Sequence, residues 1–280
     1  MNSPLVAVTE LQQLLARDEP PLVLDLRYYL GQPGRGEQEY LDGHLPGSVF
    51  VDVEEVFSGP VRPDRAGGRH PLPGAARLQE GLRAAGVDRG RPLVLLDQGN
   101  AMGAGRGWWV LADAGITDVR VLDGGLAAWR SAGLPLTSEV PDVKPGTIEI
   151  TTTGLAPQVD AVEIPAVLES GGRVVDVRAA ERYRGESEHI DPVAGHIPGA
   201  TNLPAGQLQQ PDGRFLPADE LAAVLADVRP GDVLSCGSGI TAAMVALAAE
   251  QAGIHGVRLY PGSWSDWISD PTRPVATGQE

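Results

Sequence analysis

The 280-residue sequence contains one cysteine, Cys236, and one lysine, Lys144. A single cysteine excludes an intrachain disulfide, a CxxC redox motif and a cysteine-cluster metal site. The lone lysine lies in a Pro-flanked stretch, which argues against Schiff-base chemistry. No apolar run approaches the roughly 20 residues that a membrane span requires. Any sulfur chemistry in this protein must therefore act through Cys236.

Positive charge is also scarce. The chain has 22 Lys and Arg residues against 37 Asp and Glu residues, a formal net charge of −15 at pH 7. Such a charge repels nucleic acid and anionic lipid, so we expect neither a nucleic-acid nor a membrane partner. Residues 1–19 lack the basic segment and apolar core of a signal peptide, and residues 11–19 predict a short amphipathic helix. We therefore expect a cytoplasmic protein.

The two halves of the chain repeat three motifs in the same order. The first half reads VLDLR at 23–27, GHLPG at 43–47 and LDGGLAAW at 122–129, and the second reads VVDVR at 174–178, GHIPG at 195–199 and YPGSWSDW at 260–267. Asp25 precedes Gly43 by 18 residues, and Asp176 precedes Gly195 by 19. Features shared by both halves, His44 and His196 among them, are more simply structural than catalytic. The repeat predicts two homologous domains.

Each half alternates short Val/Leu runs with Ala/Leu-rich helical stretches. We expect strands at 92–96, 119–122, 173–177 and 232–235, and helices at 75–85, 108–114, 218–226 and 241–252. This alternation predicts two α/β domains, each a mostly parallel sheet flanked by helices. We place the domains at residues 1–140 and 158–280, with a Pro- and Gly-rich linker at 141–157.

The segment CGSGITA at 236–242 follows a predicted strand and leads into a helix that begins near Thr241. Such a turn aims backbone N–H groups and a helix N-terminus at one point, and the positive potential there favours a thiolate at Cys236. Gly237 and Gly239 permit the tight turn. The alternative is that Cys236 is a small buried apolar residue at a strand end. A cysteine phosphatase would need an Arg six residues after the Cys, where this chain has Ala242.

The tandem repeat, the two Asp-x-Arg strands, the two GHxPG motifs, CGSGITA and GSWSDW together resemble the two-domain rhodanese superfamily of sulfurtransferases. The resemblance implies two rhodanese-like domains, of which the second is catalytic. The first would be a degenerate copy, because its loop after Asp97 reads QGNAM and has no Cys.

The resemblance also implies a two-step sulfur relay. The Cys236 thiolate would take a sulfane sulfur from a small-molecule donor and hold it as a persulfide, stabilised by the loop N–H groups of Gly237, Gly239, Ile240 and Thr241. It would then pass the sulfur to cyanide or to a thiol acceptor such as thioredoxin or a low-molecular-weight thiol. Neither a metal nor an organic cofactor is needed, and the five histidines show no metal-ligand spacing.

By resemblance, the donor is 3-mercaptopyruvate or thiosulfate, and Gly237 and Ser238 favour 3-mercaptopyruvate. In enzymes of that type a hydroxyl, a histidine and a carboxylate handle protons during transfer. These positions correspond to Ser238, His70 and Glu54 here, although the family has Asp where this chain has Glu54. Asp52 is the alternative carboxylate.

Arg182 corresponds to the residue of the family that binds the donor's carboxylate. The family usually has a second Arg shortly before GHIPG, but residues 185–194 contain none. Arg184 or His189 could replace it, and its absence keeps thiosulfate open as the donor.

Two further alternatives remain at this stage. The chain could be a noncatalytic module that holds a persulfide or binds a partner, although the complete loop around Cys236 argues against this. Trp264 could line the catalytic pocket or fill the core.

Overall fold

A computed structural model describes residues 3–279, which divide into two compact units. Unit 1 comprises residues 3–59, 73–155 and 209–215, and unit 2 comprises 60–72, 156–208 and 216–279. Each unit therefore incorporates a short segment from the other half of the sequence. No helix within 3–279 is both long enough and apolar enough to cross a membrane.

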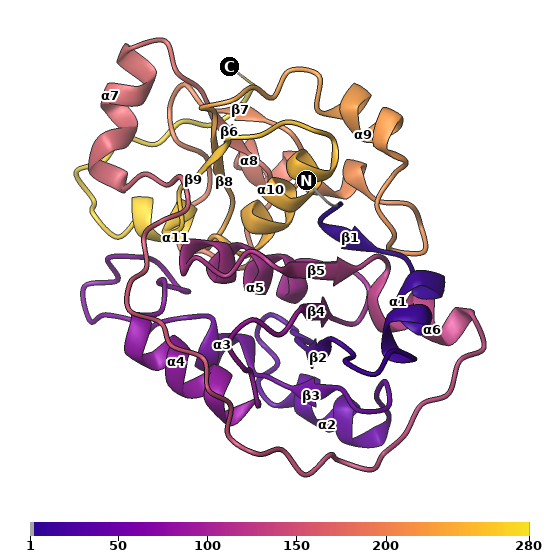
Figure 1. Cartoon of the computed structure of the whole chain (residues 1–280). Helices are drawn as coiled ribbons and strands as arrows, with labels where there is room; N and C mark the ends of the chain where they lie inside the picture. The colour runs from indigo at the N-terminus through magenta and orange to yellow at the C-terminus, as the bar shows by residue number, and fades with distance from the viewer. Residues whose placement is uncertain (1–2, 280) are drawn as a thin grey trace. The chain divides into compact units, whose positions relative to one another are not determined.

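Unit 1 contains a five-stranded parallel sheet in the order β1-β5-β4-β2-β3 (Figure 1). Its strands are Val- and Leu-rich and, apart from the edge strand β3, mostly buried, as expected for a parallel sheet covered on both faces. The strands are β1 (Leu5–Val6), β2 (Leu22–Asp25), β3 (Val49–Phe50), β4 (Leu93–Leu96) and β5 (Val119–Leu122). The helices are α1 (Val8–Leu15), α2 (Arg35–Asp42), α3 (Val53–Val56), α4 (Ala75–Ala84), α5 (Met102–Asp113) and α6 (Gly125–Ser131).

Unit 2 contains a four-stranded parallel sheet in the order β7-β6-β8-β9 (Figure 1). Its strands are β6 (Val174–Asp176), β7 (Thr201–Asn202), β8 (Val233–Ser235) and β9 (Arg258–Leu259). Its helices are the 3-10 turns η1 (Ala161–Glu163) and η2 (Ala205–Leu208), and α7 (Ile164–Glu169), α8 (Ala180–Tyr183), α9 (Ala218–Val224), α10 (Ile240–Gln251) and α11 (Ser263–Trp267). The α/β architecture with mostly parallel sheets is confirmed in both units.

Two predicted helices have the wrong ends. The helix expected at 11–19 is α1, which begins at Val8 and ends at Leu15. The helix expected at 108–114 is α5, which begins at Met102. A Cβ at Gly103 would lie only 2.1 Å from the Leu26 carbonyl oxygen, so glycine allows α5 to pack against the chain after β2. Helix propensity, which counts glycine as unfavourable, misses this tertiary requirement.

Most of the stretch expected as a linker, residues 141–155, packs on unit 1. The Gly146 N–H donates to the Arg83 carbonyl at 2.8 Å, and the Ile148 N–H donates to the Val87 carbonyl at 3.1 Å. Ile148 and Ile150 are buried. The stretch is extended because its backbone pairs with unit 1 rather than within itself.

The repeated Asp-x-Arg motif forms the same buried ion pair in each unit. Arg27 binds Asp25 and donates to the Gly43 carbonyl at 3.1 Å. Arg178 binds Asp176 and donates to the Gly195 carbonyl at 2.7 Å. The motif thus ties the end of a central strand to the GHxPG turn in both copies.

The repeated histidines have the same structural role in both units. His44 stacks on Tyr40 and His196 stacks on Tyr183, each with a ring-centroid distance of 3.8 Å. The backbone of each histidine pairs in an antiparallel bridge, His44 with Thr137 and His196 with Ala276. The expectation that they are structural agrees with these contacts.

Candidate active site

The loop around Cys236 lies between the end of β8 and the start of α10. Gly239 precedes the helix with a φ of 80°, a left-handed conformation that glycine adopts without strain. The Gly239 N–H points at the Cys236 Sγ at 3.2 Å. The side chain of Cys236 is therefore buried against the N-terminus of a 12-residue helix. Both the N–H group and the helix dipole favour negative charge on the sulfur.

Ser263, at the start of α11, holds the other side of the Cys236 loop. Its Oγ accepts the Cys236 N–H at 3.0 Å, donates to the Tyr260 carbonyl at 2.8 Å and lies 3.9 Å from the Cys236 Sγ. The Trp264 N–H donates to the Cys236 carbonyl, and the Ser265 N–H donates to the Gly237 carbonyl, both at 3.0 Å. Helix α11 thus fixes the position of the thiol.

Ser263 is not among the residues predicted from the sequence, although the repeat contains a signal. The position that corresponds to Ser263 in LDGGLAAW is Gly125, and both residues have a φ just above 50°. A serine in this left-handed conformation is unusual, whereas a glycine is not. The half that carries the cysteine has serine where the other half has glycine. This difference indicates that Ser263 is present for its hydroxyl.

Asp97 occupies the equivalent of the Cys236 position in unit 1. Strand pairing aligns Asp25 with Leu96 and Asp176 with Ser235, so Asp97 and Cys236 each follow the aligned residue. The Asp97 carboxylate accepts the N–H groups of Gly99 at 2.8 Å and Ala101 at 3.2 Å, and that of Ala104 at 3.3 Å. Burial raises the pKa of Asp97, and these N–H donors oppose the shift. The copy without a cysteine thus keeps a loop built to hold an acidic side chain.

His70 and Ser238 meet within unit 2. The His70 Nδ1 lies 2.8 Å from the Ser238 Oγ, and both side chains are buried. Backbone contacts fix the loop that carries His70, because the Gly67 N–H donates to Asp266 at 2.8 Å and the Arg69 N–H donates to the Ser265 Oγ at 3.0 Å.

Glu54 and Asp52 lie at the start of α3 in unit 1. The Asp52 Oδ1 accepts the backbone N–H groups of Glu54 at 2.7 Å and Glu55 at 3.0 Å, so this carboxylate caps the helix. The Glu54 side chain is exposed, yet partial loss of hydration and the nearby Asp52 and Glu55 carboxylates raise its pKa.

Arg182, at the end of α8, is held by two acidic side chains. It donates through Nε and one terminal nitrogen to the two oxygens of Glu188, at 3.0 and 2.9 Å, and to Asp191 at 3.1 Å. Asp191 also pairs with Arg69. Burial raises the pKa of Asp191 although both guanidinium groups oppose the shift. The pKa of Glu188 is lowered, because N–H donors and Arg182 outweigh the effect of its burial.

Both acids lie in an insertion that only the second copy has. Tyr40 precedes His44 by four residues, whereas Tyr183 precedes His196 by 13. The additional residues carry Glu188 and bring Asp191 to the arginines. This role is not among those predicted from the sequence; an insertion confined to the cysteine-bearing copy is the signal that could have revealed it.

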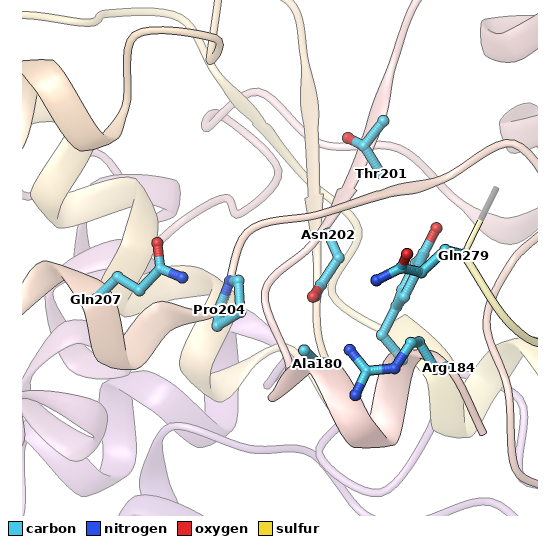
Figure 2. A pocket seen from close by; sticks show the side chains of 8 residues that line it. Ala180, Arg184, Thr201, Asn202, Pro204, Gln207 and Gln279 are labelled. Atoms are coloured by element: carbon cyan, nitrogen blue, oxygen red, sulfur yellow. The ribbon is translucent and has the colours of Figure 1, made fainter. Parts of the chain in front are cut away.

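The other residues considered in this segment point elsewhere. Arg184 pairs with Glu186 at 2.7 Å, and His189 contacts the Ser187 hydroxyl at 2.9 Å. Arg184 lines a cavity of about 420 Å³ beside β7, together with Asn202, Gln207 and Gln279 (Figure 2). No residue of the Cys236 loop lines this cavity.

Trp264 belongs to the core of unit 2. It is 1% exposed, and its indole N–H donates to the Val193 carbonyl at 2.9 Å. The Arg178 guanidinium lies over its ring, 4.9 Å from the centroid. Residues 3–279 contain no cluster of three or more His, Cys, Asp or Glu side chains suited to a metal ion.

Comparisons with known proteins agree with this geometry. A Rhodanese-like domain model matches residues 7–132 and 160–270. A 3-mercaptopyruvate sulfurtransferase of Pseudomonas aeruginosa is 45% identical over 276 residues, which cover 95% of this chain and 96% of that protein. The thiosulfate sulfurtransferase SseB of Mycobacterium tuberculosis is 42% identical over 279 residues, covering 98% and 97%. Both of these names are provisional assignments.

A solved structure is similar as well. The crystal structure of SseA from Escherichia coli, a 3-mercaptopyruvate sulfotransferase by its description, matches with a TM-score of 0.81 and 32% identity over 94% of this chain and 100% of that one. The chain therefore belongs to the rhodanese family and carries two rhodanese-like domains. Within that family it is a sulfurtransferase.

Proposed function

We propose that this enzyme takes sulfur from 3-mercaptopyruvate in preference to thiosulfate, holds it as a persulfide on Cys236 and passes it to a thiol or to cyanide. Ser238 lies two residues beyond Cys236, and its hydrogen bond with His70 is the observation that favours 3-mercaptopyruvate as the donor. We assign the chemistry to the domain at 158–280 and regard the domain at 1–140 as its degenerate copy.

The two donors differ in their need for a proton. Attack of the Cys236 thiolate on 3-mercaptopyruvate forms an S–S bond and breaks a C–S bond, so the leaving carbon must gain a proton to become pyruvate. Attack on thiosulfate breaks an S–S bond and releases sulfite, which leaves without one. A buried Ser–His pair is a proton relay that the first reaction needs and the second does not. We propose Glu54 as the carboxylate that completes the relay.

The remaining residues bind charge. Arg182 would bind the donor's carboxylate or sulfonate, because a guanidinium group matches either anion with two N–H donors. The backbone N–H groups of Gly237, Gly239, Ile240 and Thr241 would stabilise the terminal sulfur of the persulfide. The Gly239 N–H already lies 3.2 Å from the thiol and supports this role.

The acceptor we propose is thioredoxin or a low-molecular-weight thiol, and we propose the cytoplasm as the place of action. A thiol acceptor attacks the outer sulfur of the persulfide, forms a new S–S bond and returns Cys236 to its thiolate. Neither step needs an electron from outside the donor and the acceptor.

The test is kcat/KM for each donor with a thiol acceptor, using Cys236→Ser as the blank and Ser238→Ala as the variant. Acid–base catalysis contributes about 10²-fold or more, so Ser238→Ala should lower kcat with 3-mercaptopyruvate by about that factor. Its kcat with thiosulfate should change less than about tenfold. Equal losses with both donors, or a wild-type preference for thiosulfate, would overturn the choice of donor. Persulfide formation without turnover would favour a noncatalytic carrier instead.

A further inference from the structure

The family's second donor-binding arginine is missing from residues 185–194, but the structure of unit 2 provides another. Arg69 belongs to the loop at 60–72, which packs in unit 2. A Cβ built on Gly237 would lie 3.0 Å from a terminal nitrogen of Arg69 and 3.7 Å from one of Arg182. Two guanidinium groups from distant parts of the sequence therefore border the residue that follows the reactive cysteine.

One carboxylate holds both arginines in place. The Asp191 Oδ1 pairs with Arg69, and the Asp191 Oδ2 accepts from Arg182 at 3.1 Å. The Asp191 side chain is 1% exposed, whereas both arginine side chains are 20% exposed. The carboxylate thus lies beneath two guanidinium groups that remain partly open to a ligand. We call Arg69, Arg182 and Asp191 the arginine clamp.

Arg69 has hydrogen-bonding capacity that this part of the protein leaves unused. Its Nε is buried and has no hydrogen-bond partner among residues 3–279. The Nε of Arg182, by contrast, donates to Glu188. Buried N–H groups are nearly always hydrogen-bonded, so a charged donor without an acceptor, on a side chain that reaches Gly237, points to an acceptor on the ligand.

We propose that Arg69 is a donor-binding residue and that, with Arg182, it grips the carboxylate of 3-mercaptopyruvate or the sulfonate of thiosulfate. Arg69 thereby takes the place of the missing arginine, and Arg184 and His189 do not. The inference rests on the proposed function for the identity of the ligand. Whichever donor is used, Arg69 raises the affinity of the Cys236 pocket for a small anion.

Alkylation of Cys236 tests this claim without any sulfur transfer. Iodoacetate and iodoacetamide deliver similar groups to the thiolate and release iodide, but only iodoacetate carries a carboxylate. In Arg69→Gln the ratio of the iodoacetate rate to the iodoacetamide rate should fall about tenfold, because a charge-assisted hydrogen bond is lost. Arg69→Lys should give an intermediate ratio, because it keeps the charge but not the planar fork.

Arg62→Gln is the matched control. Arg62 lies in the same loop, but its side chain is 64% exposed and pairs with Asp64 at 2.9 Å. Its ratio should equal that of the wild type. The iodoacetamide rate and the melting temperature report whether the pocket of each variant is folded.

Steady-state kinetics then connect the clamp to the reaction. Arg69→Gln should raise KM for the donor about tenfold and lower kcat less, because the clamp binds rather than transfers protons. An unchanged alkylation ratio in a folded Arg69→Gln protein, or an equal fall in Arg62→Gln, would overturn the inference. Absence of sulfur transfer in the wild type, with the ratio falling as expected, would instead overturn the proposed function and leave the anion site standing.

Discussion

Ser263 shows how one side chain secures the reactive residue. It satisfies the backbone N–H of Cys236, which is buried, while its own proton goes to the Tyr260 carbonyl. Because this N–H group is hydrogen-bonded, the backbone of Cys236 is fixed in the loop. The Cys236 thiol is thereby held at the N-terminus of α10. The hydrogen bond to the Cys236 N–H offsets the energetic cost of the left-handed backbone at Ser263.

Ser263→Ala should therefore destabilise the protein without adding backbone strain. Alanine keeps the Cβ, so the unfavourable φ is unchanged and the lost partner of the Cys236 N–H dominates. The free energy of unfolding should fall by about 1–3 kcal/mol, measured by urea denaturation. Ser269→Ala, which removes a hydroxyl that donates to the Asp266 carbonyl at 2.7 Å, should cost less than about 1.5 kcal/mol. Equal costs for the two would show that Ser263 does not support the loop.

A side chain at Gly237 should impair binding of the donor rather than folding of the protein. The new methyl group in Gly237→Ala would meet a terminal nitrogen of Arg69 at 3.0 Å, and this flexible end can move away. Stability should change little, while KM for the donor should rise about tenfold as the clamp opens. Gly206→Ala places its methyl group in open space and should leave KM unchanged. An unaltered KM in Gly237→Ala would argue that the donor does not reach this side of the loop.

Some residues of the candidate site could be predicted from sequence, and others could not. Cys236 and Ser238 share one short loop whose glycines and flanking strand identify it. Ser263 and Asp191 act through contacts with residues 27 and 122 positions away, respectively, and no local pattern encodes such a distance. Arg69 stood next to a histidine singled out by resemblance, but only the fold shows that its side chain reaches Gly237.

At the scale of elements, the loop after the strand has the same form in both units and holds a different side chain in each. Asp97 accepts three backbone N–H groups in unit 1, and the Cys236 thiol receives the Gly239 N–H in unit 2. The following segment also binds each loop in the same way, since the Leu126 N–H donates to the Asp97 carbonyl and the Trp264 N–H to that of Cys236. The copy without a cysteine therefore keeps the same loop.

Asp97→Asn should destabilise unit 1 and leave the chemistry of Cys236 intact. Both carboxylate oxygens accept N–H groups, so an amide must direct its NH₂ group at a donor. The expected loss is about 1–3 kcal/mol of unfolding free energy, with unchanged iodoacetamide reactivity of Cys236. Asp64→Asn, at an exposed ion pair with Arg62, should cost much less than Asp97→Asn. A neutral effect of Asp97→Asn would show that the loop does not depend on a charged acceptor.

The elements themselves were largely predictable where hydrophobic runs and helical spacing agree. The strands expected at 92–96, 119–122, 173–177 and 232–235 all form, shortened by at most two residues. The start of helix α5 could not be predicted, because its first turns contain Gly103 and Gly107. A side chain at either position would clash with Leu26. Element ends depend on such packing, whereas element type depends on the local pattern.

At the scale of the whole molecule, charge is the property that the repeated scaffold does not explain. Only a minority of the acidic residues are buried, so the net charge of −15 arises largely from acidic residues at the surface. Like charges on a folded surface repel each other more than in the extended unfolded chain. The excess negative charge should therefore oppose folding at neutral pH.

Salt should relieve this repulsion. Raising NaCl from about 0.02 M to about 0.5 M shortens the screening length several-fold, so the melting temperature at pH 7 should rise. A gain of about 1 kcal/mol corresponds to about 2–4 °C for a domain of this size class. The control is the same titration near the isoelectric point of about 4.7, where the net charge is close to zero and salt should have little effect. An equal rise at both pH values would assign the stabilisation to preferential exclusion of salt from the protein surface, and a fall at pH 7 would show that exposed ion pairs outweigh the net repulsion.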